Sequence, residues 1–164
     1  MKRDLLIKRV KQFAIDGWEL DECHGLPHWK RVERNGLLLA TEDVNTTVVC
    51  LFAYLHDKWR IDNWEDIAHG KRAAEHLLEL RKTLLIDLSD EEFELLRKAC
   101  ELHTICHKTG NLTIDTCFDA DRLDLTRVGI IPDPERMATK RGAYYADNLY
   151  EFYTAIGEKM TFPF

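Results

Sequence analysis

The stretch Thr46–Asp57, TTVVCLFAYLHD, is almost wholly apolar until its last two residues. Asn45 stands directly before it, and asparagine is one of the residues that cap helix N-termini. Val48, Val49, Phe52 and Leu55 leave this segment without a polar face. The sequence therefore predicts a central, buried helix over residues 46–56 that ends at His56-Asp57.

The rest of the chain repeats apolar residues mainly at intervals of three and four, which predicts helices and no strand. Ser89 and Glu92 form a capping-box pattern at one helix start, and Pro132 and Pro134 interrupt the pattern further on. We expect an all-α fold, a compact helical bundle in which residues 1–164 form a single domain. The expected helices besides the central one are residues 3–15, residues 27–40, one through residues 69–80 with caps among Asp62, Asn63 and Asp66, one from Ser89 through His103, residues 114–125, and an aromatic closing helix over residues 144–153.

Length and composition exclude several classes of protein. The 164 residues suffice for a core without disulfides, and the five cysteines are odd in number and form no C-x-x-C pair, so we expect reduced thiols. The net charge is −6 and the charged residues are scattered along the chain, so we expect no concentrated basic surface of the kind that binds a nucleic-acid polymer. No apolar run reaches the roughly 20 residues that span a bilayer, and no secretory signal is evident, so we expect a cytoplasmic protein without a membrane partner.

The dipeptide His56-Asp57 is the sharpest chemical feature. An ionisable pair after an apolar helix must either reach solvent or find a compensating partner, and a metal ion is one such partner. Adjacent helical residues point about 100° apart, so both can reach one ion only near a helix end. Imidazole and carboxylate together suit Mn, Fe, Co, Ni or Zn, with Mg also allowed, and do not select among them.

Three motifs occur in a fixed order: His28-Trp29-Lys30-Arg31-Val32, then His56-Asp57, then Ala120-Asp121-Arg122-Leu123. Together they resemble the H, HD and D motifs of HD-superfamily metalloproteins, and the closest resemblance is to small bacterial HD proteins of unassigned activity. The resemblance implies a helical domain of the HD type. It also implies that a divalent metal is held by His28, His56, Asp57 and Asp121.

The alternative interpretation is that the histidines are satisfied core residues and the aspartates are helix caps or surface charges. Asp119 is the fallback for the late ligand, because it and Asp121 cannot occupy the same helix face. Alignment on Ala-Asp-Arg-Leu favours Asp121, which shares a face with Cys117 and Leu125.

The second tier of candidates includes His69 and His103, which resemble the extra histidines that some HD proteins use for a second metal or a substrate phosphate. His107 follows His103 by four residues and could join it or be solvated. Arg122 and Arg127 lie near Asp121 in sequence and are candidate contacts for a substrate phosphate. No glycine spacing resembles a phosphate-binding loop, which disfavours ATP-driven phosphoryl transfer.

We therefore expect an enzyme, a metal-dependent phosphohydrolase with one or two ions, acting on a small phosphorylated molecule such as a nucleotide through metal-activated water. Asp57 would also orient the water, and His69 or His103 would bind a second metal or assist proton transfer. The alternatives are an HD-type diiron oxygenase and a non-catalytic metal-stabilised binding module. We expect the aromatic residues near the C-terminus to pack in the core rather than to form an interface. These residues are Tyr144, Tyr145, Tyr150, Phe152, Tyr153, Phe162 and Phe164. The sequence leaves the substrate and the oligomeric state open.

Overall fold

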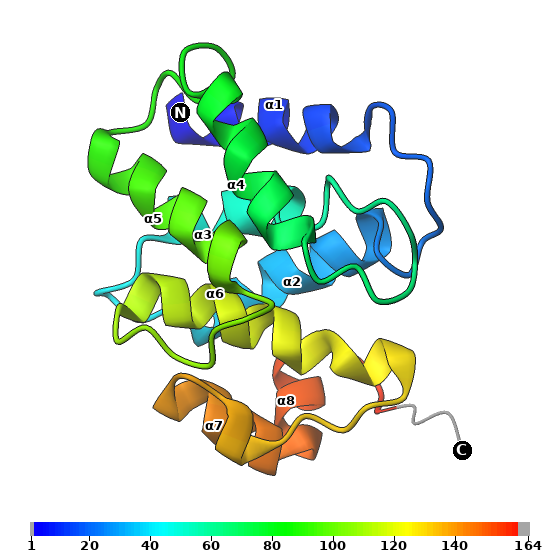
Figure 1. Ribbon diagram of the computed structural model, residues 1–164. Helices are drawn as coiled ribbons and strands as arrows, with labels where there is room; N and C mark the ends of the chain where they lie inside the picture. Colours follow the sequence, from blue (N-terminus) through cyan, green and yellow to red (C-terminus); the bar gives the residue numbers. More distant parts are fainter. Residues whose placement is uncertain (1, 161–164) are drawn as a thin grey trace.

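The computed structural model describes residues 2–160, and within them the chain is all-helical without a strand, as predicted. Figure 1 shows the helices gathered into one bundle. In chain order the elements are α1 (Lys2–Ile15), α2 (Leu26–Leu39), α3 (Thr46–Leu55), α4 (His69–Leu80), α5 (Asp90–Leu102), α6 (Leu112–Arg122), the 3-10 helices η1 (Leu123–Val128) and η2 (Pro134–Arg136), α7 (Lys140–Asp147) and α8 (Leu149–Ala155).

Helix α3 is the centre of the bundle. It packs against α1, α2, α5 and α6, and every residue from Val48 to Leu55 is buried. The predicted cap is confirmed, because the Asn45 side chain accepts a hydrogen bond from the Val48 backbone N–H at 3.2 Å. Helix α3 therefore carries His56 and Asp57 into the interior from its C-terminal end.

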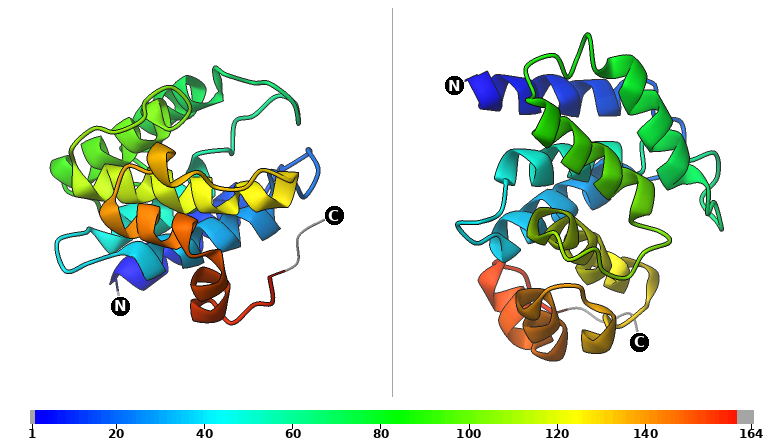
Figure 2. Two further views of the ribbon diagram at one scale, coloured as in Figure 1. Left: turned by 90° about the horizontal axis from the view of Figure 1, so that it is seen from below. Right: turned by 60° about the vertical axis from the view of Figure 1, so that its left-hand side comes forward.

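Helices α4 and α5 pack side by side, as both views of Figure 2 and the contacts between them show. Gly70 allows their close approach, because a Cβ at this position would lie 2.6 Å from the Cys100 carbonyl oxygen. The capping box of Ser89 and Glu92 is present as predicted at the start of α5. The two helices therefore bring the first residue of α4 next to the end of α5.

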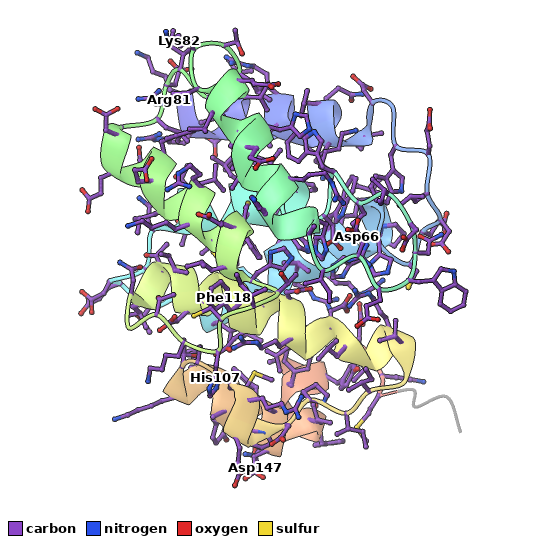
Figure 3. The ribbon with its side chains drawn as sticks, in the orientation of Figure 1. Asp66, Arg81, Lys82, His107, Phe118 and Asp147 are labelled. Atoms are coloured by element: carbon purple, nitrogen blue, oxygen red, sulfur yellow. The ribbon has the colours of Figure 1, made fainter. Side chains whose placement is uncertain are left out.

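The start of α4 differs from the prediction, since the helix begins at His69 and none of the polar residues before it caps it. The Asp66 carboxylate accepts from the Ile61 backbone N–H at 2.9 Å and pairs with Arg72. It is therefore engaged in closing the loop after α3. Figure 3 shows Asp66 on this loop, beside the first turn of α4.

Helices α7 and α8 form a layer below α6 in Figure 1. Helix α6 starts after Asn111, two residues earlier than expected, and gives way to η1 after Arg122. The predicted single closing helix is two short helices, because the backbone leaves helical geometry at Asn148 (φ −125°, ψ 59°).

The aromatic residues of this layer divide between core and surface. Phe152 is buried in the core, and Tyr145 and Tyr153 pack partly buried against it. Tyr144 and Tyr150 are exposed. Core packing therefore accounts for part of the aromatic cluster, while Phe162 and Phe164 lie outside the described residues.

All five cysteines are free thiols, and three of them are buried: Cys50, Cys100 and Cys117. Among the described residues, no helix combines the length and the apolar character needed to cross a bilayer.

Candidate metal centre

Four side chains from three helices converge below the end of α3. His28 lies in the first turn of α2, His56 caps the C-terminus of α3 with Asp57 directly after it, and Asp121 lies in the last turn of α6. His28 Nε2 lies 3.2 Å from His56 Nε2, 3.3 Å from Asp121 Oδ1 and 3.5 Å from Asp57 Oδ2. His56 Nε2 lies 3.5 Å from Asp57 Oδ2 and 3.7 Å from Asp121 Oδ1.

These spacings can be compared with those around a metal ion. Bonds of about 2.0–2.2 Å in a tetrahedral site place neighbouring ligand atoms about 3.3–3.6 Å apart. Five of the six separations among the four atoms are 3.2–3.7 Å, which is close to that range. His28, His56 and Asp57 could therefore hold one divalent ion, with Asp121 beside both histidines, and we call this set of four residues subsite 1.

A second group of donors lies on the other side of Asp57. His69, the first residue of α4, places Nε2 3.0 Å from Asp57 Oδ1 and 2.8 Å from Nε2 of His103 at the end of α5. His103 Nε2 lies 3.9 Å from the same Asp57 oxygen. Asp57 thus turns Oδ2 to subsite 1 and Oδ1 to this group, which we call subsite 2. A carboxylate placed in this way can bridge two ions.

The outer nitrogens of the four histidines identify their tautomers. Each Nδ1 lies beside an oxygen that only accepts hydrogen bonds, so Nδ1 carries the proton and Nε2 keeps a free lone pair. His69 differs from the other three because the Arg60 guanidinium also lies near both of its ring nitrogens, at 3.2 and 3.4 Å. For His28 the acceptor is the Asp124 carboxylate, at 2.7 Å. The other acceptors are backbone carbonyls: Phe52 for His56 at 3.0 Å, Cys100 for His103 at 2.7 Å, and Asp66 for His69.

This arrangement brings two pairs of Nε2 lone pairs face to face, in His28–His56 and in His69–His103. Two neutral acceptors at such distances repel each other unless a cation or a proton lies between them. The same outer contacts are those by which proteins orient metal-ligating imidazoles. The site is therefore built to hold positive charge.

The pKa values of the histidines also show that the site favours a positive charge. Burial opposes the charging of His28, but three neighbouring carboxylates outweigh it and raise the pKa of His28 to about 10: Asp121, Asp124 and Asp57. Burial lowers the pKa of His56, and it lowers the pKa of His103 to about 3. A metal-free centre thus holds one proton on His28, while the other two rings stay neutral.

The two aspartates of subsite 1 are kept ionised. Burial alone would raise the pKa of Asp57, but its histidine neighbours, His56 first among them, hold it well below the usual range. Likewise, His28 lowers the pKa of Asp121 against the effect of burial. The Asp121 side chain is 24% exposed whereas that of Asp57 is 4% exposed, so subsite 1 opens toward solvent on the Asp121 side.

Asp119, the fallback ligand, points away from this centre. Its carboxylate accepts from the backbone N–H groups of Ala138 and Thr139, each at 2.8 Å, and from the Thr139 hydroxyl at 2.7 Å. Gly142 makes room for it, because a Cβ there would lie 2.1 Å from Asp119 Oδ2. Asp119 therefore anchors the start of α7 to α6, and Asp121 is the residue of this pair that joins the donor set.

The remaining candidates are engaged elsewhere. Arg122 donates to the carbonyls of His107 and Cys106, both at 2.9 Å, and Arg127 donates to the Cys23 carbonyl at 2.9 Å. Their roles toward a substrate phosphate stay predictions. His107 does not join His103, because its Nε2 contacts the Met137 carbonyl at 3.3 Å, and Figure 3 shows it beside α7.

Two residues that the sequence did not single out for the site lie against Asp57. His24 Nδ1 is 3.4 Å from Asp57 Oδ2, and Arg60 Nη1 is 3.7 Å from Asp57 Oδ1 and 3.2 Å from His69 Nδ1. The spacings His24–His28 and Asp57–Arg60 hinted at this nearness. Both residues lie outside regular helices, however, so periodicity could not place them.

No family model matches the chain, and neither the comparison with curated proteins nor that with solved structures gives a match. Function therefore rests on the chemistry of the site itself.

Proposed function

We propose that this protein is a metal-dependent phosphohydrolase of the HD type, acting on a small phosphorylated molecule such as a nucleotide. The observation that carries the proposal is the position of Asp57, whose two carboxylate oxygens face separate donor groups. Paired metal sites that share a carboxylate suit phosphate-ester hydrolysis, because two cations can stabilise both the attacking and the leaving oxygen.

The residues that would hold the ions follow from the donor sets. Subsite 1 offers His28, His56 and Asp57, with Asp121 beside the two histidines, and subsite 2 offers His69, His103 and the second oxygen of Asp57. His56, His103 and Asp121 form a further group that could hold an ion. A divalent ion in such a site lowers the pKa of bound water toward neutrality and polarises a phosphoryl oxygen. This set of imidazole and carboxylate donors does not select among Mn, Fe, Co, Ni, Zn and Mg.

Charge supports an anionic substrate. Two divalent ions exceed the charge of the two carboxylates that would bind them, so a phosphate dianion would be attracted to the filled site. Arg60 adds a cation beside Asp57 Oδ1, and its side chain is 8% exposed. Arg60 would therefore bind a phosphoryl oxygen or stabilise the negative charge of Asp57 during the reaction. Solvent exposure of Asp121 supports a reactive site over a closed structural one.

One histidine outside the two subsites, His24, lies next to the donor atoms. His24 contacts Asp57 Oδ2 through Nδ1 and the Asn63 carbonyl through Nε2, and its side chain is 12% exposed. An imidazole between a buried carboxylate and the surface can carry a proton away from the site. We assign His24 this role, and His69 and His103 the role of ligands in subsite 2.

The test is a phosphatase screen of metal-loaded protein against phosphomonoesters, including nucleoside 5′-monophosphates, with Mn, Co, Zn and Mg compared. We expect phosphate release that is lost by about a thousandfold in Asp57→Ala. The matched control is His76→Ala, because His76 is an exposed histidine that pairs with Glu79. Turnover only with iron and dioxygen would instead establish an oxygenase, and bound metal without any turnover would establish a structural metal site.

A further inference from the structure

A small pocket lies next to the metal centre, and its lining includes Asp124, which contacts His28. It is formed where α2, η1 and α8 meet, and its volume is about 230 Å³. Ligand pockets for drug-sized molecules are about 300–1,000 Å³, so this one suits a smaller ligand. Its charged lining residues are Arg31, Arg34, Asp124, Arg127, Glu158 and Lys159.

The charges of this pocket are unbalanced in favour of cations. Four basic side chains face two acidic ones, in a chain whose net charge is −6. Arg31 Nε donates a hydrogen bond to Asp124 Oδ1 at 2.7 Å. Within residues 2–160, no hydrogen bond involves the two terminal nitrogens of Arg31. Arg34 pairs with Glu158 through Nη1, but its buried Nε has no partner among the described residues.

We propose that this pocket binds a small phosphate-class anion, either inorganic phosphate or the phosphate group of a small metabolite. Planar guanidinium groups match the oxygens of a phosphate, and two of them in one partly buried pocket give charge-assisted hydrogen bonds. The Arg31 and Arg34 side chains are each 30% exposed, so a ligand can reach them while they stay shielded from bulk solvent. The proposal concerns a site separate from the proposed reaction centre.

The pocket is connected to the metal centre by direct contacts. Arg31 Nε donates to Asp124 Oδ1, and Asp124 Oδ2 accepts from His28 Nδ1, each at 2.7 Å. Arg127 Nη1 lies 3.8 Å from the same Asp124 oxygen. An anion that shares these guanidinium groups leaves Asp124 a stronger acceptor for His28, and this makes His28 Nε2 a stronger ligand. The anion is thus an effector that tightens metal binding at subsite 1.

The experiment measures the binding of inorganic phosphate and of glycerol 3-phosphate to chelator-treated protein, by calorimetry and by NMR chemical shifts. Arg34→Gln removes a pocket cation without touching Asp124, and we expect it to weaken binding about tenfold. Glu158→Gln removes a competing carboxylate and should tighten binding severalfold, which damage to the fold would not do. Arg97→Gln is the matched control, since Arg97 pairs with Glu94 and Glu101 on α5.

The wild type and His56→Ala should bind the anion equally, because the pocket does not depend on the reaction centre. The tighter of the two probes identifies the source of the phosphate group. Absence of binding, or equal binding by wild type and Arg34→Gln, overturns the proposal even if the phosphatase activity is found.

The effector role is tested by the cobalt affinity with and without saturating sulfate, an anion that coordinates divalent ions weakly. We expect about fivefold tighter cobalt binding in wild type, and Arg34→Gln should need about tenfold more sulfate to reach the same effect. An unchanged cobalt affinity in wild type overturns the link through Asp124.

Discussion

Nε2 of His28 and Nε2 of His56 lie 3.2 Å apart although the outer nitrogen of each ring already donates its proton elsewhere. In the metal-free protein the repulsion between the two lone pairs is relieved by the proton that three carboxylates hold on His28. A divalent ion supplies more positive charge at the same place, so it would displace this proton. Metal uptake should therefore release protons and weaken as the pH falls.

Asp57 is expected to control both subsites, because each of its oxygens faces one of them. Protein purified without chelator should contain two equivalents of metal, and Asp57→Ala should lose both. His56→Ala and Asp121→Ala should lose the ion of subsite 1. Elemental analysis of the folded variants measures this, and two equivalents retained in Asp57→Ala would refute the bridging role.

His69 should affect the metal count by one. His69→Ala removes a donor of subsite 2 and leaves the four donors of subsite 1 in place, so we expect one equivalent to remain. His103→Ala should behave alike. His76→Ala serves as the control, because His76 stacks on Trp59 away from the centre. Loss of all metal in His69→Ala would show that the two subsites fill only together.

Asp124 positions a ligand without belonging to the donor set. Asp124→Asn keeps an acceptor for His28 Nδ1 but removes the negative charge, and we expect metal affinity to fall about 10- to 100-fold. A competitive chelator titration with cobalt measures this, with Glu75→Gln as a control on an exposed ion pair. Unchanged affinity would show that hydrogen bonding alone orients His28.

Asp119 should matter for stability and leave the metal count unchanged. Asp119→Ala leaves buried donors of Ala138 and Thr139 without an acceptor, at a cost of about 3 kcal/mol in the free energy of unfolding. For a chain of this length, that cost lowers the melting temperature by about 6–12 °C. Calorimetry together with elemental analysis checks both statements. Loss of metal from a folded Asp119→Ala protein would revive Asp119 as a ligand.

The stability of the metal-free protein should fall on mild acidification. His103 has its pKa lowered to about 3, so between pH 6.5 and about 3 the unfolded chain binds a proton there that the folded chain does not. The free energy of unfolding then falls by about 1.4 kcal/mol per pH unit from this residue. His28, whose pKa is raised to about 10, contributes fully throughout this window and does not offset the loss.

The measurement is denaturant unfolding in the presence of chelator across this pH window. His103→Gln has no imidazole to titrate, so its slope should be shallower by about that amount. Equal slopes for the two proteins would show that His103 is charged in the folded state.

The sequence alone determined the helical class and most helix positions, because these depend on local patterns. The apolar run after Asn45 and the capping box of Ser89 and Glu92 are read from neighbouring residues. Local sequence patterns gave wrong predictions where contacts between distant residues determine the structure. Asp66 is used to close a loop in place of capping a helix, and the aromatic segment bends at Asn148.

The motifs around His28, His56 and Asp121 pointed to one ligand set, but only the tertiary structure showed what surrounds it. The division of Asp57 between two subsites depends on the close packing of α4 and α5 at Gly70. The choice between Asp119 and Asp121 depends on where α7 docks. Arg31, Asp124 and His28 are joined across almost a hundred residues of sequence, and no local periodicity encodes contacts of that range.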